Sequence, residues 1–184
     1  MNTESVKTKP SLLENVLDFI EVAVFALVMV AVLFAFFIRV VAVDGDSMND
    51  TLMHQDHLVL TKAFYTPDYG DIVVIGRENS MPLIKRVIAK EGDTIYIDPK
   101  TLEVVLNGEV LNEPYVHYDN LSYDLKEPIT VPPDHVFVMG DHRNNSHDSR
   151  MKSVGCVPVD RIIGKAVWRF MPYESFGGIY DNLK

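Results

Sequence analysis

The stretch VAVFALVMVAVLFAFFIRVVAVDGDSM, residues 22–48, decides how the chain is organised. Its first 17 residues, Val22–Ile38, carry no charge, and its end is the polar turn Gly45-Asp46-Ser47-Met48. As a helix, the uncharged part covers roughly 25 Å, which approaches the thickness of the hydrocarbon core of a bilayer. The remaining sequence has the mixed polarity of a water-exposed fold. We therefore predict one N-terminal transmembrane helix that holds a folded body close to a lipid surface.

The chain divides into three parts on this basis. Residues 1–14 form a polar tail, residues 15–39 the transmembrane anchor, and residues 40–184 the body. Lys7 and Lys9 are the only basic residues before the anchor. Because basic residues favour the cytoplasmic side of membrane helices, we predict a single-pass protein of the cell membrane. Its N-terminus is cytoplasmic, its body is extracytoplasmic, and its anchor contacts membrane lipid.

A cleavable signal peptide and a buried core helix are the two alternative interpretations of the apolar segment. A signal peptide begins with a net positive charge and has a shorter apolar region, whereas Glu14, Asp18 and Glu21 lie beside a long one. A core helix usually keeps a polar face for solvent, and Val22–Ile38 has none. Both alternatives fit the sequence less well than an anchor does.

Composition argues against several classes of function. The 184 residues include 17 Lys and Arg against 26 Asp and Glu, and the formal net charge of -9 argues against binding nucleic acid. Cys156 is the only cysteine, which excludes an intrachain disulfide and a cysteine-based zinc site. His142 and His147 lie beside Asp141 and Asp148 and permit a metal site, but no ligand spacing requires one. We predict no metal and no cofactor.

Beyond the anchor, short runs rich in Val, Ile and aromatic residues recur between turn signals. The expected strands are His57–Thr61, Asp71–Ile75, Leu83–Ala89, Thr94–Ile97, Glu103–Val110, His135–Met139 and Ile163–Phe170. Asn107-Gly108 is the clearest hairpin turn, because both residues tolerate positive φ. Asn112–Pro133 has four prolines and little alternation, which indicates a loop or a small excursion. The predicted fold class is mostly β, an antiparallel sheet with a small inserted β or loop region at about 98–134.

Ser47 is the candidate nucleophile, and a serine needs a base to take its proton. Six histidines leave a Ser-His-Asp arrangement open. The strongest alternative base is Lys85, which as a strand residue shares a face with Leu83, Val87 and Ala89. Burial on that apolar face would lower its pKa from about 10.4 by up to about 3 to 5 units. The competing interpretation is that Lys85-Arg86 is a solvated pair on an edge strand.

The loop Gly140–Arg150 follows a predicted strand directly and is dense in hydrogen-bonding groups. Its carboxylates, guanidinium groups, amides and hydroxyls can orient a base and stabilise a site through ion pairs. A solvated polar turn is the alternative interpretation.

Taken in order, these motifs resemble type I signal peptidase. The resemblance covers about Val43 to Ala166 and is carried by Gly45-x-Ser47-Met48 with Thr51-Leu52, Gly70-Asp71-Ile72-Val73-Val74, Lys85-Arg86-Val87 with Gly92-Asp93, Gly140-Asp141-x-Arg143, Asn145-Ser146-x-Asp148-Ser149-Arg150, Gly155-x-Val157-Pro158 and Gly164-Lys165-Ala166. Each motif alone is weak, but their common order is specific. The resemblance implies a membrane-bound serine endopeptidase that removes signal peptides from secretory preproteins.

The resemblance also implies roles for individual residues. Ser47 attacks the scissile carbonyl, Lys85 is the general base, and the Ser47 backbone N–H serves the oxyanion hole. The implied supporting residues are Ser146, which hydrogen-bonds the lysine amine, Asp141, which pairs with Arg86, and Asp148, which pairs with Arg150. Candidates for shallow substrate pockets are Met48, Leu52 and Ile84. The preferred substrates would carry small residues at the -1 and -3 positions.

The chain departs from the family pattern at several positions. Gly45 stands where some members place a serine that adds a second oxyanion donor, Asp50 replaces a proline, and His142 replaces an asparagine. None of these removes the nucleophile or the base. Two rival functions share parts of the pattern: a soluble self-cleaving repressor, which the anchor argues against, and a catalytically silent membrane-anchored chaperone or assembly factor, which the retention of Ser47 and Lys85 argues against.

Overall fold

The computed structural model describes residues 11–61, 65–78, 80–116, 124–125 and 127–180. Two compact units make up the chain, residues 1–37 and residues 38–184. The first contains the helix α1, Leu12–Phe37. A reciprocal cap begins it, because the Ser11 N–H donates to the Glu14 carboxylate (2.6 Å) and the Glu14 N–H donates to the Ser11 hydroxyl (3.2 Å).

The helix contains one candidate membrane span, Leu12–Val32. Its side chains are exposed wherever they are described, as expected of a helix made for a lipid environment. The helix starts inside the predicted tail and ends before Ile38 and Arg39, which open a strand instead. Lys7 and Lys9, on which the predicted orientation depends, lie outside the described residues.

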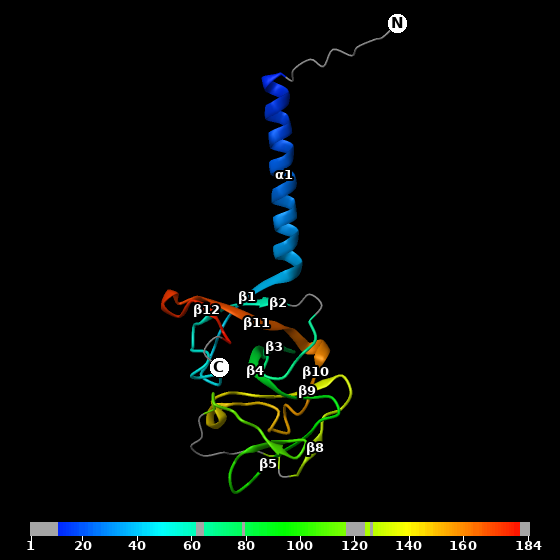
Figure 1. Cartoon of the computed structure of the whole chain (residues 1–184), viewed down its shortest axis with the longest axis vertical. Helices are drawn as coiled ribbons and strands as arrows, with labels where there is room; N and C mark the ends of the chain where they lie inside the picture. Colours follow the sequence, from blue (N-terminus) through cyan, green and yellow to red (C-terminus); the bar gives the residue numbers. More distant parts are fainter. Residues whose placement is uncertain (1–10, 62–64, 79, 117–123, 126, 181–184) are drawn as a thin grey trace. The chain divides into compact units, whose positions relative to one another are not determined.

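The second unit is built on one eight-stranded sheet, with strand order β1-β2-β11-β3-β4-β9-β10 and β12 paired with β11. Its strands are β1 (Ile38–Ala42), β2 (His57–Thr61), β3 (Ile72–Arg77), β4 (Ser80–Lys90), β9 (His135–Met139), β10 (Val157–Pro158), β11 (Ile162–Met171) and β12 (Gly177–Gly178). Every pairing is antiparallel. In Figure 1, β11 is the long orange strand of this unit. The predicted fold class is confirmed.

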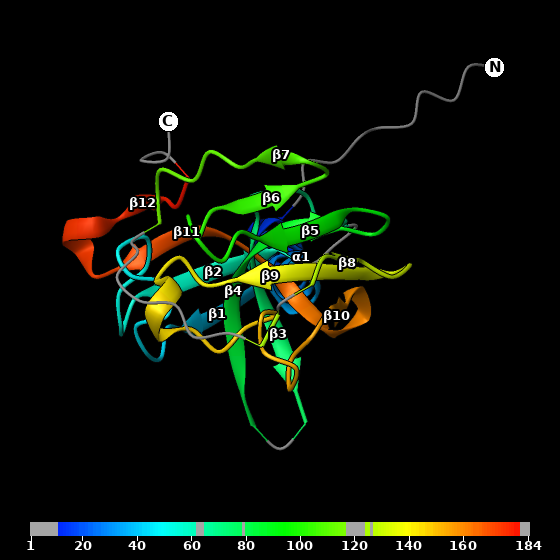
Figure 2. The ribbon, with the colours of Figure 1, turned by 90° about the horizontal axis from the view of Figure 1, so that it is seen from below.

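A smaller four-stranded sheet has the order β7-β6-β5-β8. Its strands are β5 (Thr94–Ile97), β6 (Val104–Leu106), β7 (Glu109–Val110) and β8 (Ile129–Thr130). Figure 2 shows these four strands gathered together. The predicted turn at Asn107-Gly108 is confirmed, since both residues have positive φ (53° and 88°). The small sheet starts at Thr94, slightly before the predicted insertion.

The predicted strands differ from the observed ones mainly where strands are short. Bounds are confirmed for β2, β5 and β9. Sequence analysis missed β1, β8, β10 and β12, three of which have only two residues and are defined by their partners rather than by their own composition. Three short 3-10 helices complete the described part of this unit: η1 (Arg143–Asn145), η2 (Val159–Arg161) and η3 (Tyr173–Ser175).

Strand β4 is the element that positions the site. It pairs with β3 along residues 80–86, and Figure 2 shows β3 and β4 extending together as a long hairpin. On its other side β4 pairs with β9 only from Arg86 onwards. A register shift between Val87 and Ala89 interrupts the alternation of side chains there, so Ile88 and Ala89 pack in the same core cluster. The predicted common face of Lys85 and Ala89 is therefore wrong.

Candidate active site

The turn at Ser47 meets strand β4 at Lys85. The Lys85 Nζ lies 2.7 Å from the Ser47 Oγ and donates a second hydrogen bond to the Ile84 carbonyl oxygen (2.8 Å). Lys85 is only 2% exposed. The interpretation of Lys85 as a solvated edge residue is therefore wrong, and the structure brings the two residues into direct contact although 38 positions separate them in sequence.

Burial changes the chemistry of this amine. Removal from water disfavours the charged form and lowers the pKa of Lys85 to about 8, even though the negative charge of Asp148 acts in the opposite direction. The uncharged amine therefore has a substantial population at mildly alkaline pH, and its lone pair can accept the Ser47 proton. The arrangement can perform nucleophilic chemistry with a lysine base.

Asp141 connects strand β4, which carries Lys85, to the segment that follows Ser47. Its two carboxylate oxygens accept hydrogen bonds from the Arg86 Nε (2.8 Å) and Nη2 (2.6 Å), and both side chains are at most 1% exposed. Burial by itself lowers the pKa of Arg86, but the hydrogen bonds and charge of Asp141 raise it above its usual value. The Thr51 hydroxyl also donates to Asp141 (2.6 Å). This pair therefore anchors the segment that follows Ser47.

Asp148 is the second buried carboxylate of the loop. It accepts hydrogen bonds from the Arg150 Nε (2.8 Å) and Nη2 (2.9 Å), from the Ser146 hydroxyl (2.6 Å) and from the Gly140 N–H (3.0 Å). Burial alone raises the pKa of this carboxyl group, but the hydrogen bond and charge of Arg150 hold it below its usual value. The loop is thus a fixed part of the site and not a solvated turn.

Ser146 lies in this network, but its hydroxyl donates to Asp148. The expected hydrogen bond between Ser146 and the Lys85 amine does not form among the described residues, where the amine contacts Ser47 and Ile84. A carboxylate is a stronger acceptor than an amine, which accounts for the choice. Ser146 therefore reaches the lysine only through Asp148, whose charge acts on Lys85.

Gly140 holds the loop against the nucleophile. A Cβ atom at this position would collide with the Ser146 side chain and with the Ser47 carbonyl oxygen. His142, two residues later, donates its backbone N–H to the same Ser47 carbonyl oxygen (3.1 Å). The His142 ring Nδ1 lies 3.2 Å from the Asp46 backbone carbonyl oxygen. The loop and the turn of the nucleophile are thus in direct contact.

The three candidate substrate-pocket residues belong to one core cluster. Met48 is 1% exposed, Leu52 is fully buried and Ile84 is 8% exposed. Ile84 is the most exposed of the three, so a pocket at this cluster would be reached through Ile84 first. Their contact with a substrate stays a prediction.

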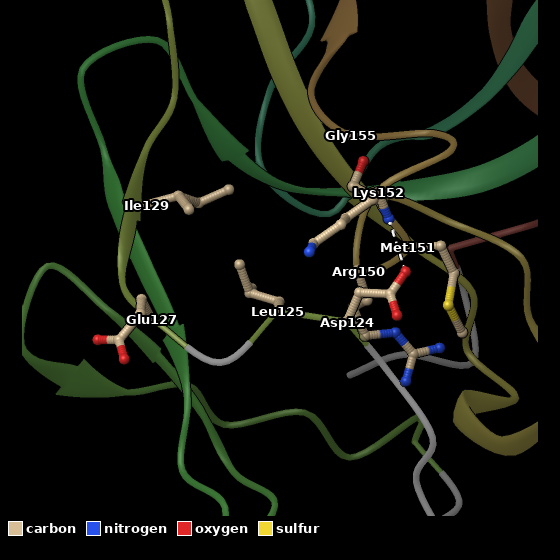
Figure 3. Close-up of a pocket in the computed structure, with 9 residues that line it drawn as sticks. Asp124, Leu125, Glu127, Ile129, Arg150, Met151, Lys152 and Gly155 are labelled. Carbon is tan, nitrogen blue, oxygen red and sulfur yellow. Dashed lines mark hydrogen bonds between the residues drawn. The ribbon is translucent and has the colours of Figure 1, made fainter.

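A separate hollow of about 440 Å³ lies beside Arg150, at the end of the loop Gly140–Arg150 (Figure 3). Figure 3 shows the side chains of Leu125, Ile129 and Lys152 directed toward it, and Asp124 accepting a hydrogen bond from the Lys152 N–H (3.0 Å). Arg150 also lines this hollow. Neither Ser47 nor Lys85 belongs to its lining, so the hollow is not the place where the two residues would meet a substrate.

Sequence analysis missed two residues that contact this network, Glu113 and Tyr115. Glu113 forms a buried ion pair with Arg143 (2.6 Å), and the Tyr115 ring lies 4.0 Å from the Arg86 guanidinium carbon. Both fall in Asn112–Pro133, where no periodicity indicates which side chains turn inward. The only available signal was indirect: a buried arginine such as Arg143 needs a carboxylate partner.

Comparisons with known proteins identify the family of this chain. The sequence model of the family described as "Signal peptidase, peptidase S26" matches residues 16–171. The chain belongs to this family. It is therefore a serine peptidase of the signal peptidase I type.

Individual relatives extend over most of the chain. Signal peptidase I P of Bacillus subtilis subsp. natto is 33% identical over 95% of this chain and 97% of its own length. Signal peptidase I S of Bacillus subtilis strain 168 gives the same identity and coverage. Probable signal peptidase I-1 of Synechocystis is 36% identical over 82% of this chain and 83% of its own. A solved signal peptidase I from Enterococcus faecalis V583 is 28% identical, with a TM-score of 0.46, over 56% of this chain and 98% of its own.

Proposed function

We propose that this signal peptidase cleaves secretory preproteins by a Ser47-Lys85 dyad through an acyl-enzyme. The observation that carries the proposal is the 2.7 Å separation of the Lys85 Nζ and the Ser47 Oγ in a buried setting. Membership of the signal peptidase family supports the removal of signal peptides as the reaction. The alternative of a catalytically silent homologue finds no support, because the relatives are named signal peptidases.

The steps follow from the two groups. Uncharged Lys85 takes the hydroxyl proton of Ser47 as the Ser47 oxygen bonds to the scissile carbonyl carbon. The resulting ammonium gives this proton to the leaving amine, the C–N bond breaks, and the signal peptide stays esterified to Ser47. Water then attacks the ester carbonyl while Lys85 accepts its proton, and the proton returns to the Ser47 oxygen as the acid is released. The base is regenerated after each turnover.

One backbone donor is available for the oxyanion. Among the described residues, the Ser47 N–H has no hydrogen-bond acceptor, which leaves it free to bind a developing negative charge. The Gly45 N–H donates to the His54 Nδ1 instead (3.2 Å), and a glycine supplies no hydroxyl. The oxyanion hole of this chain therefore depends on Ser47 itself more than in members that have a serine two positions earlier.

The open edge of β4 suits an extended substrate. Residues Ser80–Lys85 pair with β3 on one side, and within the described part of the chain no strand pairs with them on the other. A preprotein could add there as a strand, with affinity supplied by its main-chain hydrogen bonds. Alternate side chains of such a strand point the same way, so the -1 and -3 residues would face Ile84 together. The shallow, filled cluster beneath Ile84 favours small residues.

The membrane setting is part of the same proposal. Helix α1 would anchor the protein in the cell membrane, with the N-terminus cytoplasmic and the body extracytoplasmic. Ser47 lies ten residues after Phe37, so a fully extended chain keeps it within about 36 Å of the end of the helix. The nucleophile would meet chains that emerge from the same lipid surface.

The test uses the full chain in detergent micelles and a preprotein with an Ala-x-Ala cleavage site. Wild type should release the signal peptide, and Ser47→Ala and Lys85→Ala should each lower kcat/KM by about 10⁴-fold or more. Lys100→Ala, which removes an exposed lysine of the same unit, is the matched control and should keep wild-type activity. Full activity in Lys85→Ala would refute the role of Lys85 as the base. A preprotein left uncleaved by wild type would refute the proposed function.

A further inference from the structure

A short segment of the inserted region touches the catalytic network from outside the main sheet. Glu113 accepts two hydrogen bonds from Arg143, at 2.9 Å from Nη1 and 2.6 Å from Nη2. Their side chains are 3% and 1% exposed, respectively. A buried, bidentate pair of this kind holds both partners in one geometry. The inserted region is thus fixed to the loop that carries the catalytic support residues.

Arg143 transmits this contact toward Ser47. Its Nε donates to the Gly140 carbonyl oxygen (3.0 Å), and its own carbonyl oxygen accepts a hydrogen bond from the Arg150 Nη2 (2.8 Å). Gly140 packs against the Ser47 carbonyl so closely that no Cβ fits between them. A shift of the Arg143 side chain therefore displaces a backbone that has no free space on the side of the nucleophile.

Tyr115 provides a second contact from the same segment. Its ring lies 4.0 Å from the guanidinium carbon of Arg86, the arginine that binds Asp141. Its hydroxyl donates to the Glu113 carboxylate (3.2 Å). One face of the buried Arg86 is therefore covered by an aromatic ring, which is a favourable position for a desolvated cation.

We propose that Glu113 and Tyr115 are positioning residues for the peptidase reaction, which hold the Arg143 and Arg86 side chains so that Gly140 and Asp141 keep Ser47 aligned with Lys85. This inference deepens the proposed Ser-Lys mechanism and rests on it. Neither residue touches the dyad, so both act through the two arginines. The inserted region then contributes to catalysis and is not a neutral excursion from the fold.

The charge of Glu113 gives the proposal a distinctive readout. Glu113→Gln keeps the shape of the side chain but removes the negative charge that contacts the buried Arg143 guanidinium. The added net positive charge near the site disfavours the protonated form of Lys85, so the Lys85 pKa should fall by roughly half a unit. A loss of alignment should lower kcat by about 10- to 100-fold, while KM changes less than about threefold. A contact that only stabilises the fold would leave the kcat of the folded variant unchanged, so the fall in kcat at nearly constant KM is the test of positioning.

The experiment compares wild type with Glu113→Gln in the full chain in micelles. The Lys85 pKa is followed by NMR of the ¹⁵N-labelled lysine amine, assigned by its loss in Lys85→Ala, and kcat and KM are measured on the preprotein. Glu109→Gln, the same change at an exposed position of the inserted sheet, is the control and should match wild type. An unchanged Lys85 pKa and kcat in folded Glu113→Gln would overturn the proposal, as would an equal loss in Glu109→Gln.

A second pair of variants keeps the test decisive if Glu113→Gln does not fold. Tyr115→Phe keeps the ring beside Arg86 and should retain kcat within about threefold, whereas Tyr115→Leu should lose about tenfold. Equal kcat values for these two variants would overturn the role of the ring. If wild type cleaves nothing, the proposed function fails, but an unchanged Lys85 pKa in folded Glu113→Gln would still overturn the coupling of Glu113 to the dyad.

Discussion

Buried cations in this site are of two kinds, and the difference between them explains the chemistry. Arg86, Arg143 and Arg150 each bind a carboxylate at 2.6–2.8 Å. Lys85 is equally buried, but among the described residues its hydrogen bonds go to a hydroxyl and a carbonyl oxygen. Asp141 offsets the desolvation of Arg86, whereas desolvation dominates for Lys85 and lowers its pKa toward neutrality. The three ion pairs stabilise the surrounding loop and strands, and the Lys85 amine, which has no carboxylate partner among the described residues, is the reactive group.

Breaking one arginine pair should have the largest effect on stability. Asp141→Asn keeps the shape of the side chain but leaves Arg86 buried without a counter-charge, so we expect the free energy of unfolding to fall by about 3–5 kcal/mol. Chemical denaturation of the full chain in micelles, followed by tryptophan fluorescence of Trp168, measures the change. A loss below about 1 kcal/mol would mean that the pair is as weak as a surface pair.

Removing the unpaired cation should act in the opposite direction. At pH 7 the Lys85 amine is protonated when the protein folds, although burial has lowered its pKa to about 8. Lys85→Met should therefore raise the free energy of unfolding by up to about 3 kcal/mol at pH 7, while abolishing activity.

The difference in stability between Lys85→Met and wild type should depend on pH. Between about pH 8 and the unfolded pKa near 10.4, the unfolded state binds more protons than the folded state, so wild-type stability rises with pH. The advantage of Lys85→Met should therefore shrink over this range and be lost at about pH 10.4. Denaturation midpoints of both proteins at pH 7 and pH 10 check it. A variant that is less stable than wild type at pH 7 would contradict the account.

The close contact between Gly140 and the Ser47 turn predicts a smaller effect on stability. In Gly140→Ala the new methyl group overlaps the Ser47 carbonyl oxygen and the Ser146 side chain. We expect overpacking to lower the free energy of unfolding by about 1–3 kcal/mol and the displaced nucleophile to lower kcat by roughly 100-fold. Gly108→Ala, at an open turn position with positive φ, is the control for backbone strain without overlap and should keep wild-type kcat.

The weakest effect should come from an ion pair at the surface. Lys90 and Asp68 lie 2.7 Å apart, with side chains 33% and 70% exposed. Water and salt screen such a pair, so Lys90→Gln should leave both kcat and the denaturation midpoint unchanged within error. A loss comparable with that of Asp141→Asn would remove the distinction between buried and surface pairs.

The sequence predicted most of the site because its residues carry local signals. Alternation placed Lys85 on an apolar strand face, and the resemblance to type I signal peptidase implied the pairing of Asp141 with Arg86 and of Asp148 with Arg150. The partner of Ser146 was mispredicted because a carboxylate two positions away competes for its hydroxyl. These are choices between nearby acceptors, which residue spacing does not resolve.

The contacts of Glu113 and Tyr115 were not predictable for a different reason. Thirty residues separate Glu113 from Arg143, and the loop between strands has no hydrophobic period that shows which side chains are buried. The short strands β8 and β10 were missed on similar grounds, since two residues hold too little pattern to identify a strand. Their existence depends on long-range pairing, which the local sequence does not encode.

The central claim is that the uncharged amine of Lys85 removes the proton of Ser47. The most direct test is the pH dependence of kcat/KM for the full chain in micelles, measured from pH 6 to pH 10 on a preprotein, because kcat/KM reports the base of the free enzyme. We predict one acidic limb with a midpoint near pH 8, below which kcat/KM falls about tenfold per pH unit. A midpoint near 6.5, as for a histidine base, or a rate that does not change over this range, would contradict the account.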